Sequence, residues 1–427
     1  MTVKPLKVKV EYPCLNEKIK CKDSTLAEFR DAVIKFERNS SRFFFDHSGA
    51  DKSFARKAIT TAGNKLLNTI PLSATEAQKC YWSARVHHMM NPTNPRALEL
   101  AEKALRLNAF MVDAYILMAN INWAMKDLNK AKICIHEAHS TEPSPKTMAY
   151  LSSSFRIAST QVKDTRQKEI LISKAIEMAK SALKISPDYV FAQYNLGMSY
   201  FYMFFLPERK NETFLKCGIA ICEKATEHPD DPFLRSDLFI NLAEGYIFLQ
   251  DYGKAIDRLK MAQKLEGNLN EQEGPLAALY ADLQKLYFEY DKQKSAVSIQ
   301  KAMNPELDLD DEKKTQSITD IEINPKAAIV VKVLAQITTS QSTPKNYVVE
   351  DSSSNVAVLS IYNVGDSIKI LVKDLLTLTD LSFMRTSLPY LGDIEILKAT
   401  EPEKILKNGK PLDPSEIQAT SLSVNIH

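Results

Sequence analysis

Glycine is scarce in this sequence, and several features that mark particular function classes are missing with it. Only 11 of the 427 residues are glycine, which disfavours loops that hold phosphate groups. The 55 basic and 53 acidic residues leave a net charge of +2, so no overall field directs the chain to nucleic acid or membrane, although a local basic patch is compatible with this balance. No stretch approaches about 18 uninterrupted apolar residues, which argues against a transmembrane helix.

Cysteine is sparse and scattered, with six residues and no CxxC pair. This spacing indicates neither a zinc site nor a disulfide framework, so we expect reduced thiols in the cytosol or nucleus. The first residues, MTVKPLKVKVEYP, lack the continuous apolar core of a signal peptide. The six cysteines are Cys14, Cys21, Cys80, Cys134, Cys217 and Cys222.

Catalytic motifs are also missing, since the chain contains no GxSxG sequence and no P-loop. His136 and His139 lie in HEAH, whose three-residue spacing differs from the four-residue spacing of the zinc motif HExxH. We assign this pair to an outer helix face. We therefore expect no enzymatic activity, no metal, no cofactor and no small-molecule substrate.

What the sequence does contain is a repeated helical pattern. The stretches QYNLGMSY, FINLAEGY and YILMANIN each place a small residue directly after a large one, at Gly197, Ala243 and Ala119. A second helix follows in which small and large residues alternate at helical spacing, as at Ala131, Ile135 and Ala138. Small residues at these positions let two antiparallel helices approach closely. The pattern is that of the tetratricopeptide repeat, a helix–turn–helix of about 34 residues, and it assigns Gly197 to a close helix contact.

Two less regular units, residues 78–108 and 146–187, extend this array. Residues 25–68 are expected to form an N-terminal helical cap and residues 275–303 a closing helix, because the ends of a stacked array need shielding from water. We therefore predict an N-terminal extension over residues 1–24 and a repeat superhelix with caps over residues 25–303. Polar insertions around TQVKDTRQKE and PERKNETF interrupt the third and fourth units.

The pattern changes near residue 325. Residues 304–325 are acidic, polar and bounded by proline, which predicts a linker. Residues 326–427 contain short β-branched runs, AAIVVKVLAQI, NYVVED, NVAVLSIYN and DSIKILV, separated by turn signals. About five short strands of this kind are typical of a small barrel or a sandwich, and an oligonucleotide/oligosaccharide-binding (OB) barrel is one five-stranded option. Periodicity alone does not choose between them.

Several short motifs, taken in order along the chain, resemble the tetratricopeptide repeat protein 5 (stress-responsive activator) family. They are RFFFDHS near the start, Leu151-Ser152 with Arg156, Asp237-Leu238 with Asn241, SIYN followed by VGDSIKI, and NGKP near the end. The chain departs from that family after Asn363, where a single valine leads into Gly365 and the barrel is correspondingly shorter.

The resemblance implies a multidomain α-then-β architecture, in which a tetratricopeptide-repeat α-solenoid precedes a small C-terminal OB-fold-like β-barrel, without enzymatic activity. It further implies an adaptor that binds the N-terminal Met-Arg-Glu peptide of nascent tubulin at the ribosome, near the exit tunnel, and mediates decay of tubulin mRNA through a downstream adaptor. The alternative that it implies is a nuclear scaffold for transcriptional coactivators in stress responses. The expected location is cytoplasmic, and nuclear under the second role.

Charged and polar residues on the first helices of the repeats match such a peptide. Arg156 is expected to bind the glutamate of the peptide as a charge-assisted pair, the alternative being a bond to an Asp or Glu of a neighbouring repeat. Asp237 or Glu244 is expected to receive the arginine or the amine of the peptide. Asn241 can bond the extended peptide backbone. Asn120, Trp123 and Tyr194 are further inward positions, and the two aromatic residues among them are equally compatible with a packing role.

Lys292 and Lys294 resemble a Lys-x-Lys pair of the same family and are the candidate contacts with ribosomal RNA phosphates.

Two further functions are disfavoured. A clamp for C-terminal carboxylates needs several basic residues along the groove, and single-stranded nucleic acid binding by the barrel needs aromatic platforms in a basic groove, whereas the barrel region has few aromatic residues and mixed charge.

Overall fold

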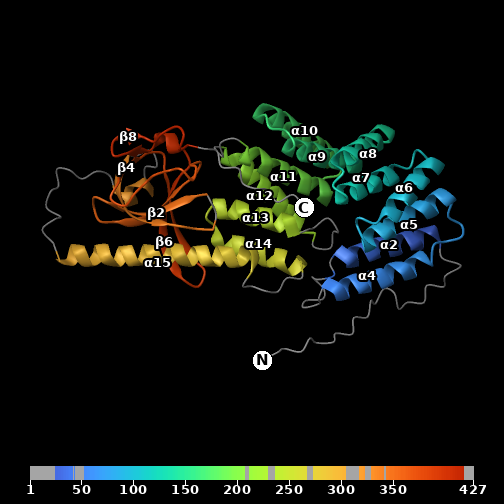
Figure 1. Ribbon diagram of the computed structural model, residues 1–427, viewed down its shortest axis with the longest axis horizontal. Coiled ribbons are helices and arrows are strands. Elements are labelled where there is room, and N and C mark those ends of the chain that lie inside the picture. Colours follow the sequence, from blue (N-terminus) through green and yellow to red (C-terminus); the bar gives the residue numbers. More distant parts are fainter. Residues whose placement is uncertain are drawn as a thin grey trace, which may run out of the picture. The chain divides into compact units, whose positions relative to one another are not determined.

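The computed structural model describes residues 25–41, 43, 52–206, 211–228, 236–266, 273–303, 317–322, 328–340 and 343–417. Within these ranges thirteen α-helices precede eight β-strands (Figure 1). The residues group into two compact units. The first takes the described residues within 1–203, 217–239 and 261–269, and the second takes the described residues within 204–216, 240–260 and 270–427. The predicted extension over residues 1–24 with Cys14 and Cys21, most of RFFFDHS, the PERK insertion and residues 304–316 lie outside the described residues.

The helices follow one another as antiparallel pairs, as the repeat pattern predicts (Figure 1). The two helices of a pair pack together along their lengths, most extensively α9 with α10, α5 with α6, and α7 with α8. The helices are α2 (Leu26–Ser41), α4 (Lys52–Leu67), α5 (Glu76–Met90), α6 (Pro95–Leu107), α7 (Val112–Ala124), α8 (Leu128–Thr141), α9 (Pro145–Thr160), α10 (Thr165–Ile185), α11 (Val190–Phe205), α12 (Glu212–Thr226), α13 (Ser236–Phe248), α14 (Tyr252–Glu266) and α15 (Gly274–Met303).

Local sequence fixes where several of these helices begin. Thr75 and Gln78 form a reciprocal capping box at the start of α5, and Ser144 and Thr147 form another at the start of α9. In the turn NPTNP, Asn94 caps α6 and the proline that follows takes its first helical position. Such caps satisfy backbone N–H groups that have no partner inside the helix.

The close helix contact predicted at Gly197 is confirmed. A Cβ atom on Gly197 would lie 2.3 Å from Sγ of Cys222 and 3.1 Å from the carbonyl oxygen of Gly218. Gly218 faces the same contact from α12, where an added Cβ would lie 3.0 Å from the ring of Phe201. The two helix backbones therefore touch at paired glycines, and this packing offsets the helix cost of glycine, about 1 kcal/mol relative to alanine.

The strands form one eight-stranded sheet in the order β5-β6-β3-β2-β1-β4-β7-β8. Neighbours pair antiparallel except β3 and β6, which run parallel, and β1 carries an irregularity between Val333 and Ala335. The strands are β1 (Ile329–Ile337), β2 (Lys345–Asp351), β3 (Val356–Ile361), β4 (Leu375–Leu378), β5 (Ser382–Leu388), β6 (Gly392–Ala399), β7 (Leu406–Lys407) and β8 (Lys410–Pro411).

The prediction of a strand at DSIKILV is wrong. Ile368 and Ile370 are buried in the barrel core as alternation predicts, but the segment joins no strand. Its amides are taken by side chains instead, since Lys369 N–H donates to Glu416 at 3.1 Å and Leu371 N–H donates to Asp374 at 2.8 Å. Backbone groups bonded in this way are not available to a neighbouring strand.

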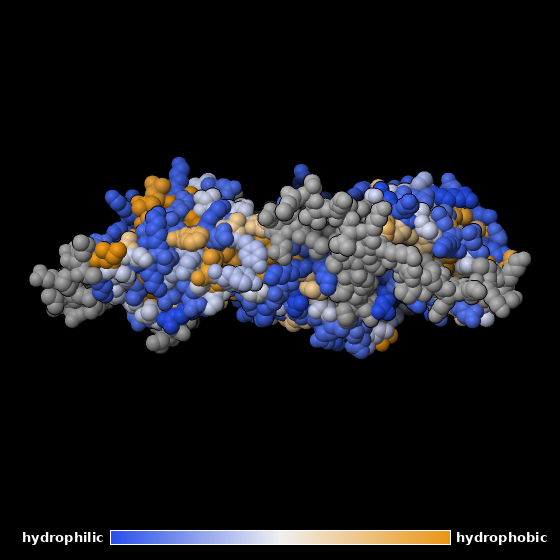
Figure 2. All heavy atoms as spheres, turned by 90° about the horizontal axis from the view of Figure 1, so that it is seen from below, coloured by the Kyte–Doolittle hydropathy of each residue, from blue (hydrophilic) through white to orange (hydrophobic). Residues whose placement is uncertain are grey.

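Part of the segment predicted as a linker packs into the barrel. Residues Ile318–Glu322 form the 3₁₀ helix η3, and both Ile318 and Ile321 are fully buried in the barrel core. The helix α15 lies against β1, β2, β3 and β6, and its Asp282 accepts a hydrogen bond from the backbone N–H of Ser340 at 2.8 Å. On the face shown in Figure 2, exposed apolar side chains are scattered among hydrophilic ones.

Candidate functional site

Three of the residues predicted to bind a peptide lie together in the first unit. Arg156 on α9, Tyr194 on α11 and Asp237 at the start of α13 come from the first helices of three successive repeats, and all three side chains are buried. The first helices of neighbouring repeats pack side by side in this fold, which is why residues about 40 positions apart in sequence meet.

Arg156 is the centre of this cluster, with only 5% of the residue exposed. Its guanidinium donates a hydrogen bond to Oδ1 of Asn195 at 3.2 Å and lies over the rings of Tyr194 and Tyr202, at 5.7 and 5.4 Å from their centroids. Burial works against its charge, but Tyr194, Tyr202 and Asp237 outweigh this, and the pKa of Arg156 lies above its ordinary value.

Two buried polar groups in the cluster have no hydrogen-bond partner among the described residues. They are Nε of Arg156 and the hydroxyl of Tyr202. The hydrogen bond described for the guanidinium of Arg156 goes to a neutral amide, and Asp237 acts on its charge electrostatically. A buried guanidinium normally pairs with an anion or uses most of its five N–H groups, so this cation keeps unused capacity to bind an acceptor.

Asp237 is held by a different partner. The hydroxyl of Tyr194 donates to Oδ2 of Asp237 at 2.6 Å, and the backbone N–H of Leu238 donates to Oδ1 at 2.9 Å. Tyr194 therefore interacts with both charged groups: the guanidinium of Arg156 lies over its ring, and its hydroxyl donates to the carboxylate of Asp237. The predicted opposite charges are linked through an aromatic residue.

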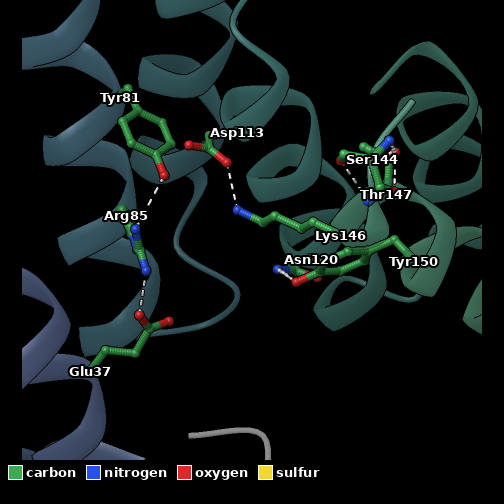
Figure 3. Close-up of polar contacts among 9 residues, drawn as sticks. All are labelled: Glu37, Tyr81, Arg85, Asp113, Asn120, Ser144, Lys146, Thr147 and Tyr150. Atoms are coloured by element: carbon green, nitrogen blue, oxygen red, sulfur yellow. Dashed lines mark hydrogen bonds and ion pairs between the residues drawn. The ribbon is translucent and has the colours of Figure 1, made fainter. Parts of the chain in front are cut away.

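Asn120 lies in a second row of polar contacts, along the first helices of the earlier repeats (Figure 3). Its amide donates to the hydroxyl of Tyr150 at 3.2 Å, joining α7 to α9. Beside it, Lys146 forms an ion pair with Asp113 across the same two helices. Asn120 is therefore engaged with α9.

The same row continues toward the N-terminal helices, where Arg85 pairs with Glu37 and also donates to the hydroxyl of Tyr81 (Figure 3). Burial raises the pKa of Tyr81, and the Asp113 carboxylate adds to that effect. Sequence reasoning missed this row. A signal was present, because Asp113 and Asp237 occupy equivalent positions before Ala119 and Ala243, as Tyr81 and Tyr194 do before Ala84 and Gly197.

Asn241 and Glu244 follow Asp237 on α13, one and two helical turns later. Asn241 is buried and Glu244 is half-buried, and each has interaction partners within the structure. Trp123 is half-buried near the end of α7. Asn241, Glu244 and Trp123 therefore all lie on the first helices of their repeats, as predicted.

The two candidate ribosome contacts lie two positions apart on α15. Lys292 is exposed and forms an ion pair with Glu289 at 3.1 Å. Lys294 is also exposed and donates to the hydroxyl of Tyr290 at 2.8 Å, which raises its pKa. Both ammonium groups are therefore held by side chains of their own helix.

Other kinds of site find no support in the described ranges. They contain no group of three or more His, Cys, Asp or Glu side chains placed to hold a metal ion, and none of their helices is long and apolar enough to cross a membrane. The four described cysteines are unpaired. Burial raises the pKa of the Cys134 thiol to about 11.

Comparison with known proteins agrees with this architecture. The family model described as the tetratricopeptide repeat protein 5 OB fold domain matches residues 313–421. Tetratricopeptide repeat protein 5 of Homo sapiens is 21% identical over 411 residues, which cover 90% of this chain and 91% of the relative. The protein of that name from Bos taurus is 20% identical over 423 residues, covering 93% and 94%.

Solved structures with similar helices include a thermophilic TPR protein from Thermus thermophilus, which is 16% identical with a TM-score of 0.40 and covers 48% of this chain and 99% of its own. The APC/C hetero-tetramer Cut9–Hcn1 is 14% identical with a TM-score of 0.44 and covers 60% and 43%.

The matched barrel, the order of helices and strands, and the relatives' nearly full coverage confirm the predicted fold class. A solenoid of paired helices offers a row of side chains for binding other polypeptides. The chain is thus similar over most of its length to tetratricopeptide repeat protein 5, its residues 313–421 match the OB fold domain of that family, and the repeats and the similarity support a protein-binding adaptor.

Proposed function

We propose that this protein is a non-enzymatic adaptor that binds the N-terminal Met-Arg-Glu peptide of nascent tubulin at the ribosome and so mediates co-translational decay of tubulin mRNA. The family relationship supports the general role of protein binding. The observation that supports this particular ligand is the buried Arg156, whose Nε has no hydrogen-bond partner among the described residues and whose guanidinium interacts with the hydroxyl of Tyr202.

The two groups suit the glutamate of the peptide. A carboxylate accepts hydrogen bonds from both an arginine N–H and a tyrosine hydroxyl, and a charge-assisted bond to arginine is about twice as strong as a neutral one. Asp237 is the matching anion for the arginine or the free amine of the peptide, with Asn241 and Glu244 next on the same helix. Because Arg156 is only 5% exposed, binding requires the rings of Tyr194 and Tyr202 to shift.

Binding of a fluorescent peptide that begins Met-Arg-Glu tests this assignment. Arg156→Met keeps the length and packing of the side chain but removes the cation, so we expect Kd to rise more than about tenfold, the effect of losing a buried charge pair. The same peptide with glutamine in place of glutamate should bind the wild type as weakly as the original peptide binds the variant.

The matched control is Arg85→Met. Arg85 also lies on a first helix and over an aromatic ring, that of Trp82, but it already pairs with Glu37. This variant should bind the peptide as the wild type does. Equal affinity of the Arg156→Met variant and the wild type, with both folded, would reject the assignment.

In cells the proposed function places the protein in the cytoplasm on ribosomes that synthesise tubulin. Crosslinking to such ribosomes should be lost in the Arg156→Met variant. Retained capture of ribosomes by this variant would contradict the proposal. Co-purification with nuclear coactivators alone would favour a scaffold for transcription in its place.

A further inference from the structure

A buried lysine joins the barrel to helix ends within the second unit. Lys398 lies on β6, with its side chain only 6% exposed, and its ammonium group is 2.9 Å from Oε1 of Glu212 at the start of α12. The residues are 186 positions apart in sequence. The ion pair therefore connects a strand of the OB-fold domain with a helix of the last repeats.

Aromatic rings surround this ammonium group. It lies 3.9 Å from the centroid of Phe248, the last residue of α13, and 5.4 Å from that of Tyr362, which follows β3. Phe248 contacts Tyr362 at 4.6 Å and Phe204 of α11 at 4.9 Å between ring centroids. Thr386 on β5 adds a hydrogen bond to the carbonyl oxygen of Gln250 at 3.4 Å.

The energetics of this contact depend on Glu212. Burying an ammonium group costs several kcal/mol unless it is paired, and removing one partner of a buried pair is far more costly than replacing both by apolar groups. Attraction to the aromatic faces offsets part of the cost. Burial lowers the pKa of Lys398, and the Glu212 carboxylate acts against that shift. The Glu212 carboxylate does not rely on Lys398 alone for a cationic partner, since it also pairs with the exposed Lys216 at 3.2 Å.

We propose that Lys398 and Glu212 form a charge latch, which keeps the barrel docked on the ends of α12 and α13 only while the Glu212 carboxylate neutralises the buried ammonium group. Loss of the charge on Glu212 leaves Lys398 buried and unpaired, and the contact opens so that the ammonium group reaches water. The latch therefore predicts that loss of the charge on Glu212, at the start of α12, destabilises the barrel around Lys398 on β6.

Hydrogen exchange on the full chain, followed by mass spectrometry, tests the latch. Glu212→Gln keeps the shape of the side chain and removes its charge. We expect amides of β3, β6 and the last turn of α13 to exchange at least about tenfold faster in this variant. This is less than the full cost of breaking a buried pair, because the Glu212 side chain is 35% exposed.

The double variant Glu212→Gln/Lys398→Met separates charge from packing. Methionine covers the same rings without a charge, so exchange in these segments should return to within about threefold of the wild type. The control is Asp380→Asn, which removes one of the two carboxylate partners of Lys404, an exposed lysine on the barrel surface, and should leave exchange in β3, β6 and α13 unchanged.

Unchanged exchange in β3 and β6 of the Glu212→Gln variant would overturn the latch. So would a double variant that exchanges as fast as the single one, because the opening would then come from lost packing at Glu212 and not from an unpaired lysine.

Discussion

At Gly197 a missing side chain lets two helices of one repeat touch along their backbones. We expect Gly197→Ala to lower the free energy of unfolding by about 1–3 kcal/mol, the usual cost of overpacking a rigid contact, because the new methyl group would meet Sγ of Cys222 and the backbone of Gly218. Denaturation in urea, followed by circular dichroism, measures the change.

Gly253 on α14 is the control for this substitution, since a Cβ atom there would have only Asp251 within 4 Å, at 3.9 Å. Gly253→Ala should raise stability by up to about 1 kcal/mol through helix propensity alone. If both substitutions stabilised the protein equally, the hypothesis that Gly197 is needed for close packing of the two helices would be rejected.

The hydroxyl of Tyr194 gives a second expectation for a single residue. Tyr194→Phe removes the hydrogen bond to the buried Asp237, and the loss of a partner for a buried acceptor costs about 1–3 kcal/mol. Thermal unfolding should show the loss. Tyr115→Phe removes a hydroxyl from a half-buried tyrosine on α7, the first helix of an earlier repeat, and should change stability by less than about 0.5 kcal/mol.

For whole elements, pH provides a test at the start of α12. Burial raises the pKa of Glu212, but Lys398 and Lys216 outweigh it, so the pKa lies below the ordinary 4.5. A carboxyl group whose pKa is lower in the folded state contributes stability that is fully present above about pH 4.5 and is lost as the pH falls through the folded value. The barrel and the ends of α12 and α13 should therefore loosen below about pH 4.5.

Hydrogen exchange between pH 6 and pH 3.5, corrected for the intrinsic pH dependence of exchange, measures this loosening. In the Glu212→Gln variant the acid-induced step in β3 and β6 should be absent, because no carboxylate remains to be protonated there. An acid step of the same size in both proteins would assign the loosening to other carboxyl groups.

At the scale of the whole molecule, ribosome binding should depend on salt. If Lys292 and Lys294 contact RNA phosphates, the double variant Lys292→Ala/Lys294→Ala should lower the slope of log affinity against log salt by about 2, which is about 1 for each lost contact. Lys285→Ala on the same helix α15, where Lys285 faces Asp282, is the control. Binding by the wild type that is flat in salt would reject the two contacts.

The fold was largely predictable because its signals are local. Small residues such as Gly197 and Ala243 repeat at fixed places in each unit, and turn residues such as Asn94 and Pro95 mark where helices begin. The same local logic failed at DSIKILV, where two buried isoleucines imitate a strand but side chains of Asp374 and Glu416 take its amides. The hydrophobic periodicity of a segment does not reveal hydrogen bonds from its backbone to side chains outside it, such as the bond from Lys369 to Glu416, 47 residues away.

The sequence by itself determined the paired helices, the succession of helices and strands, and Arg156, Tyr194 and Asp237 as candidates, because helix period, turn residues and short motifs are properties of neighbouring residues. Only the tertiary structure decided that Arg156 is buried between two tyrosines, that Ile318 belongs to the barrel core, and that Lys398 meets Glu212. Burial and charge pairing arise when segments far apart in the chain pack together, and no local pattern encodes which segments these are.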